Sequence, residues 1–200
     1  MIIASPTNDG QFLVTVFWPR DAFQGVRSDI EGSFMRALGQ VPDLAERLHN
    51  GRRTERFYGT GDVPFFFRKP YGTGWALVGD AGYHKDPITA QGITDSFRDA
   101  DLVAGAVDAG LGGQRPLDEA LADYEQRRNE EVMPMYEFTQ QLAALKPPAP
   151  EMQQLFAALR YNQEQTDRFF GTITGAVSIP EFFAPENLER IMTGAQAATV

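Results

Sequence analysis

The sequence has 200 residues and no cysteine, and its 18 basic and 27 acidic residues give a net charge of −9 at pH 7. A globular chain of this length buries roughly 70% of its unfolded surface, so it can fold without cross-links, and the lack of cysteine excludes disulfides, thiolate metal sites and a thiol nucleophile. Because phosphate backbones and anionic membranes are bound by clustered lysine and arginine, we expect neither nucleic acid nor a membrane as a partner.

The N-terminal residues 1–5 lack a basic region and include only a few apolar residues before Pro6. They therefore do not match a secretion signal or a membrane span, and no apolar run elsewhere approaches the length of about 18 residues that a span needs. We expect a cytoplasmic protein.

The first part of the chain predicts strands with inserted helices. Residues 1–4 and 12–18 flank the turn signal Asn8-Asp9-Gly10, which predicts a hairpin. Ser28 and Glu31 have the spacing of a capping box, so a helix is expected from there to Gly39. A second helix is expected to begin at Pro42 and to end near Gly51.

Further strands are expected at 52–58, 65–68 and 75–78. From Ile93 onward apolar residues recur at helical spacing, and the predicted helix ends near Gly110. Almost everything after Pro116 is predicted to be helical. In that region Pro134 is expected to kink a helix, Pro147-Pro148 to end it, and Ser178 with Pro180 to cap a short one. The fold class expected from these patterns is α+β or α/β.

One segment, from Gly74 to Gly92, carries the pattern of a ligand site. Gly79-Asp80 stands at the carboxyl end of a predicted apolar strand, where open α/β sheets place ligands. Gln91-Gly92-Ile93 opens a helix, whose free N–H groups and positive dipole end face back toward the loop. Taken alone, such a Gly-Asp pair favours an aspartate that only caps a turn.

The spacing of the segment makes it more specific. Asp80 is followed by Pro87 seven residues later and Gly92 five after that, and the pattern continues through Ile93-Thr94 to Asp99-Ala100. This pattern resembles the second FAD-binding motif of the group A flavin monooxygenases, which have the fold of para-hydroxybenzoate hydroxylase.

The resemblance implies roles for particular residues. Asp80 would bind the ribityl hydroxyls of FAD, while Pro87 and the backbone of Gly92, Ile93 and Thr94 would face the pyrimidine edge of the flavin. Gly79 and Gln91 complete the expected cofactor-binding set. The match has two departures: Tyr83 stands where many relatives have histidine, and Thr94 stands where asparagine is frequent. The first departure leaves any role of His84 in doubt, with a surface loop as the favoured interpretation.

The family's other FAD motif, a Gly-x-Gly-x-x-Gly turn between a strand and a helix, does not occur in the sequence. Gly59-Thr60-Gly61 and Gly72-Thr73-Gly74 are interpreted as turns. We therefore expect the C-terminal part of a longer flavoprotein that lacks its N-terminal dinucleotide-binding part. Residues 1–70 would be part of the substrate-binding domain of a partial para-hydroxybenzoate hydroxylase-like fold, 71–113 the flavin-motif strand, loop and helix, and 114–200 a helical region.

Other catalytic patterns are missing. The sequence has no Gly-x-Ser-x-Gly and no Walker motif, and its two histidines, His49 and His84, make a triad or a histidine-rich metal site improbable. Residues 52–56 form a basic cluster that favours a solvated strand face over a nicotinamide-phosphate site. Residues 65–67 are three phenylalanines, for which core packing is favoured over lining a substrate pocket.

The sequence therefore predicts an FAD-dependent oxidoreductase, with NAD(P)H as co-substrate, that acts as a monooxygenase on an aromatic or polyketide-like small molecule. A halogenase or another flavin oxidation would use much the same site. The alternative of a different class is a non-catalytic remnant or partner-binding module, and the exposed edges of a partial sheet raise the further option of self-association. Alone, the chain is expected to bind FAD weakly or not at all and to lack NAD(P)H oxidase activity.

Overall fold

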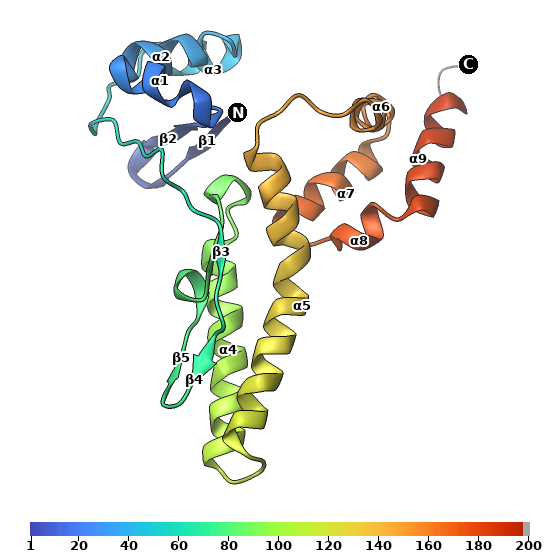
Figure 1. Cartoon of the computed structure of the whole chain (residues 1–200). Coiled ribbons are helices and arrows are strands. Elements are labelled where there is room, and N and C mark those ends of the chain that lie inside the picture. The colour runs from blue at the N-terminus through green and yellow to red at the C-terminus, as the bar shows by residue number, and fades with distance from the viewer. Residues whose placement is uncertain (198–200) are drawn as a thin grey trace. The chain divides into compact units, whose positions relative to one another are not determined.

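The computed structural model describes residues 1–197, with side chains described up to residue 194. The chain divides into two compact units, Met1–Val63 and Pro64–Val200. The fold is mixed α+β, because long helices are combined with three two-stranded antiparallel sheets in the described part of the chain (Figure 1). None of the helices in that part is long and apolar enough to cross a membrane.

The first unit contains one hairpin and three short helices. Its elements are β1 (Ile2–Pro6), β2 (Phe12–Val16), α1 (Phe23–Ser28), α2 (Ile30–Leu38) and α3 (Pro42–His49). β1 and β2 pair antiparallel in the register Ile2 to Val16. Asp9 and Gly10 both take the left-handed conformation that the connecting turn needs, with φ of 56° and 68°. The predicted hairpin and the helix beginning at Pro42 are thus confirmed.

Two predictions in this unit are wrong. The N-cap of α2 is Asp29, not Ser28, because the Asp29 carboxylate accepts the Gly32 N–H at 3.0 Å. Residues 52–58 form no strand. In this segment the Arg53 guanidinium lies over the Phe57 ring and pairs with Glu31 at 3.2 Å, and the Arg56 guanidinium lies over the Tyr58 ring.

The strands of the second unit are short. They are β3 (Phe66–Phe67), β4 (Tyr71–Gly72), β5 (Trp75–Ala76) and β6 (Tyr83–His84), with β3 paired to β6 and β4 to β5. The strand expected over 75–78 is therefore limited to β5, which forms a hairpin with β4 around Gly74 at a φ of 80°. Gly79-Asp80 follows this antiparallel hairpin and not a strand of an open parallel sheet.

The rest of the second unit is helical. The helices are α4 (Gly92–Leu111), α5 (Leu117–Ala143), α6 (Pro150–Leu159), α7 (Gln163–Thr174), α8 (Ile179–Phe182) and α9 (Pro185–Ala197). α4 and α5 run side by side in opposite directions (Figure 1), and Ala106 of α4 packs against Ala120, Leu121 and Tyr124 of α5. α5 continues through Pro134 and ends before Pro147, so the predicted stop is confirmed.

The C-terminal helices enclose a core of their own. Leu155 and Leu159 of α6 pack with Phe182 of α8 and Ile191 of α9. The predicted cap of the short helix is confirmed, because the Ser178 hydroxyl accepts the Glu181 N–H at 3.4 Å. Helix α7 also contacts the loop that precedes α4, because the Gln91 Nε2 donates to the Ile173 carbonyl at 2.8 Å.

Candidate functional site

The Gly79-Asp80 pair forms a 3₁₀ turn, Gly79–Ala81, that lies directly on helix α4. The Gly79 N–H donates to the buried carboxylate of Asp99 at 2.9 Å. Gly79 has a φ of 52°, and a Cβ at this position would collide with the Ser96 hydroxyl and lie 3.1 Å from the Ser96 Cβ. Only glycine therefore satisfies both the backbone conformation and the close approach to the helix.

Asp80 and the start of α4 lie next to each other. Asp80 is exposed, and its Oδ1 is 3.9 Å from the position that a Cβ on Gly92 would occupy. The Gln91 side chain does not cap the helix. The first N–H groups of a helix have no intrahelical partner, so those of Gly92, Ile93 and Thr94 point out of the helix end. A carboxylate and an uncapped helix start thus share one open surface.

The loop between them is held in a strained shape. Pro87 is exposed and opens a short 3₁₀ turn, Pro87–Thr89, which is capped by the Asp86 carboxylate. Ala90 then takes a φ of 55°, a conformation that disfavours residues with a Cβ. Ala90 lies two residues before Gly92, where the helix end that faces Asp80 begins.

Gln91 has a different place from the other predicted site residues. Its side chain is buried, and Nε2 donates to the carbonyl of Ile173 at 2.8 Å and to that of Thr89 at 3.3 Å. The side chain of Gln91 therefore ties the loop to helix α7 and does not reach the open surface beside Asp80.

The outer face of α4 next to this surface is apolar and exposed. Ile93 is 76% exposed and Phe97 is 73% exposed. The two residues are four positions apart and therefore lie on one face of the helix, one turn apart. These two side chains form a small exposed apolar area next to the start of α4.

Buried charges hold the loop from the side of α4. The Lys85 ammonium forms an ion pair with Asp95, and both side chains are buried. The Arg98 guanidinium donates to the other Asp95 oxygen at 2.9 Å and to the Tyr83 hydroxyl at 2.8 Å. Burial raises the pKa of Tyr83, so this phenol stays protonated at neutral pH.

Helix α5 holds the chain that leads into the Gly79 turn. The Tyr124 hydroxyl donates to the Leu77 carbonyl at 2.7 Å. Arg128 is fully buried, and its guanidinium donates to the Arg68 carbonyl at 3.0 Å and lies over the ring of Phe67. Sequence analysis did not identify these supporting residues, because each acts on a backbone group far away in the chain.

The two histidines and the phenylalanines of residues 65–67, whose roles the sequence left open, all have structural contacts or positions. The His84 Nδ1 lies 2.6 Å from the Pro64 carbonyl, and the ring stacks on Phe66 across the β3–β6 pair. His49 is the last residue of α3. Phe65 and Phe67 both pack edge-on against Tyr136, as the core interpretation predicts.

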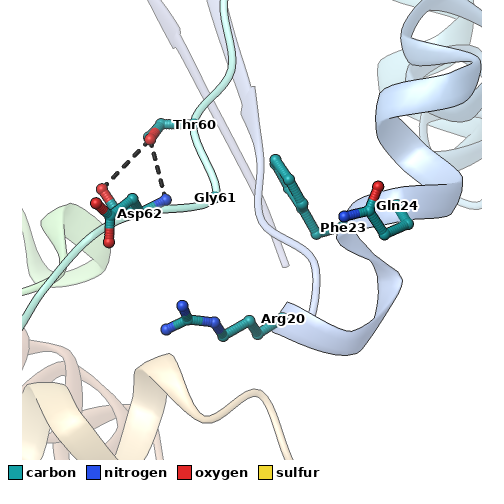
Figure 2. Close-up of a pocket in the computed structure, with 6 residues that line it drawn as sticks. All are labelled: Arg20, Phe23, Gln24, Thr60, Gly61 and Asp62. Carbon is teal, nitrogen blue, oxygen red and sulfur yellow. Dashed lines mark hydrogen bonds between the residues drawn. The ribbon is translucent and has the colours of Figure 1, made fainter.

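The first unit contains an open cavity of about 410 Å³ (Figure 2). It is lined by Arg20, Phe23, Gln24, Thr60, Gly61 and Asp62. Among its lining residues, the Thr60 hydroxyl accepts the Asp62 N–H at 3.1 Å, and Gly61 lies against the Phe23 ring. The Gly59-Thr60-Gly61 string leads into no helix and bends at Gly61, and none of the predicted cofactor residues lines this cavity.

Comparisons of the chain with protein-family models, with curated proteins and with solved structures give no match. Any argument about function therefore depends on the residues of this chain and their geometry.

Proposed function

We propose that the chain carries the flavin-facing half of the FAD site of an NAD(P)H-dependent monooxygenase that acts on an aromatic or polyketide-like small molecule. The observation that supports this most directly is the placement of the exposed Asp80 carboxylate beside the uncapped start of α4, across the open face of Gly92. The resemblance in spacing from Gly79 to Asp99 supplies the identity of the cofactor.

The groups at this surface fit a flavin with its ribityl chain. A carboxylate such as that of Asp80 accepts hydrogen bonds from hydroxyl groups, and the glycine at position 92 leaves space for a flat ring against the backbone. The N–H groups of Ile93 and Thr94 can donate to the pyrimidine edge, where the reduced ring carries negative charge that a helix N-terminus stabilises.

The cofactor would supply the redox chemistry. Bound FAD would supply hydride acceptance from NAD(P)H and the activation of O₂, so few catalytic side chains would be required of the protein. In this proposal, Asp80 orients the ribityl chain and the start of α4 stabilises the negative edge of the ring.

The remaining half of the FAD site is proposed to come from a polypeptide region with a strand, a Gly-x-Gly-x-x-Gly turn and a helix, a pattern that the 200-residue sequence does not contain. The exposed Ile93 and Phe97 beside the site supply apolar area for such a region to cover. Without it the pyrophosphate has no helix start of its own, which is why weak binding of FAD to this chain is expected.

Amide NMR of the ¹⁵N-labelled chain, titrated with millimolar ligand, tests the proposal even when binding is weak. FAD and FMN are expected to shift the amide signals of Gly92, Ile93 and Thr94, whereas AMP leaves them unchanged because it lacks the flavin and the ribityl chain. Asp80→Ala removes hydrogen bonds to a charged group and should weaken the response about tenfold to a hundredfold.

A matched pair of glycine variants locates the ring. Gly92→Val should abolish the shifts, whereas Gly105→Val, at an equally open position on the same helix, should leave them intact. Asp108→Ala, at an exposed acid of α4, is the control for Asp80→Ala. If the flavin response is missing in the wild type, or is the same in all variants, Asp80 is only a turn residue and the flavin assignment is wrong.

A further inference from the structure

Asp99 is a buried charge that binds a single backbone group. Its side chain is 0% exposed, and Oδ2 accepts the Gly79 N–H at 2.9 Å. Oδ1 makes no hydrogen bond with any described residue and lies 3.6 Å from the Arg98 guanidinium. Burying a carboxylate in this way costs free energy. The one hydrogen bond that the Asp99 carboxylate makes with a described residue holds the Gly79 amide.

The position of Asp99 on α4 connects it to the open surface. Gly92 and Asp99 are seven residues apart on one helix, which is close to two full turns, so they lie on the same face. Gly79 docks on that face between them, at Ser96. The residue that follows Gly79 is Asp80, whose carboxylate reaches back to Gly92. Helix α4 therefore carries both Asp99, which binds the Gly79 N–H, and the helix start that the turn faces.

We infer that Asp99 is a positioning residue of the proposed flavin site, which sets the place of the Asp80 carboxylate relative to the start of α4 by holding the Gly79 N–H. Asp99 lies beneath the turn and does not itself contact a ligand at the open surface. The inference rests on the proposed function, because the ribityl chain is what Asp80 would meet there.

The test uses three variants of the full chain and two measurements. Asp99→Leu removes the acceptor, Asp99→Asn keeps an acceptor oxygen without the charge, and Asp101→Leu changes an exposed acid on the same helix as a control. The first measurement, made without ligand, is the shift and hydrogen exchange of the Gly79 amide. The second is the FAD-induced shift of the Gly92 amide.

In Asp99→Leu we expect faster exchange at Gly79 and an FAD response at Gly92 about tenfold to a hundredfold weaker than in the wild type. Asp99→Asn should keep Gly79 protected and restore most of the response, and Asp101→Leu should match the wild type. Recovery of the FAD response in Asp99→Asn distinguishes a positioning role of Asp99 from a general loss of stability. If Asp99→Leu does not fold, the response of Asp99→Asn alone tests the inference.

The inference is overturned if Asp99→Leu binds FAD like the wild type, or if Asp99→Asn loses the response while Gly79 stays protected. If instead the proposed function is wrong, FAD shifts no amide signal of the wild-type chain. The Gly79 amide then still decides whether Asp99 holds the turn: unchanged exchange in Asp99→Leu refutes it, and faster exchange supports it.

Discussion

The close contact between the Gly79 turn and α4 predicts a large cost for Gly79→Ala. At a φ of 52° an alanine pays the left-handed penalty of about 1–2 kcal/mol. The added Cβ also collides with the Ser96 hydroxyl, and overpacking of this kind costs about 1–3 kcal/mol. The free energy of unfolding of the second unit should therefore fall by about 2–5 kcal/mol.

Gly74→Ala separates the two contributions. Gly74 also has a positive φ, 80°, but no atom lies within 4 Å of its added Cβ, so this variant should lose only the conformational part. Urea unfolding followed by far-UV circular dichroism measures both variants, because the long helices of the second unit dominate that signal. Ser96→Ala should recover part of the Gly79→Ala loss in a double-mutant cycle. Equal losses for Gly79→Ala and Gly74→Ala would refute the steric argument.

Two contacts that hold the loop give further predictions. Tyr124→Phe leaves the Leu77 carbonyl without its donor and should lower the unfolding free energy by about 1–3 kcal/mol. Burial raises the pKa of Tyr124 to about 12, so an ultraviolet titration of the variant should lose the phenol that ionises there, while Tyr83, whose pKa is also raised by burial, is retained. Asp95→Asn leaves Lys85 buried without its counter-charge and should cost about 3–5 kcal/mol, much of which Lys85→Met should restore in the double variant. A loss for Asp95→Asn no larger than that of a surface substitution would contradict this reasoning.

Part of the secondary structure around the candidate site could be predicted from short sequence patterns. The helix start at Gly92 was predictable because glycine and proline mark turns and element ends within a short segment, whereas Gly79 was expected at the end of a sheet strand and lies in a 3₁₀ turn. The β4–β5 hairpin was not predictable from alternation, because strands of two residues are too short to show a period. The strand predicted at 52–58 is wrong, because the arginines of this segment stack on its own aromatic rings, as Arg53 does on Phe57, without a partner strand.

The contacts that hold the Gly79 turn and the chain before it could not be predicted for another reason, although Asp99 itself belongs to the recognised motif. Asp99 and Gly79 are 20 residues apart, and Tyr124 and Leu77 are 47 apart. Each pair joins a side chain to a backbone group, and backbone groups leave no trace in the residue pattern. The buried side chain of Gln91 could not be placed from the sequence for the same reason, since its partner is the backbone carbonyl of Ile173.

The burial of Asp99 predicts how stability depends on pH. Burial raises the pKa of its carboxyl, against the opposing effects of the Gly79 N–H and of the Arg98 and Arg128 guanidinium groups; the nearby Asp95 carboxylate raises it further. An acid with a raised folded pKa binds its proton more tightly in the native state, so its ionisation lowers stability as pH rises from the unfolded value of about 3.9 through the folded value.

Asp99→Asn has no such proton to lose. Its unfolding free energy should match that of the wild type most closely in acid and should rise relative to the wild type as the pH approaches neutrality. Urea unfolding of both proteins across this range measures the difference, in which the titration of the other carboxyls largely cancels. A difference that stays constant with pH, or that favours the wild type increasingly toward neutral pH, would show that the Gly79 N–H and the two guanidinium groups outweigh the cost of burial. The carboxylate would then stabilise the fold as well as hold the turn.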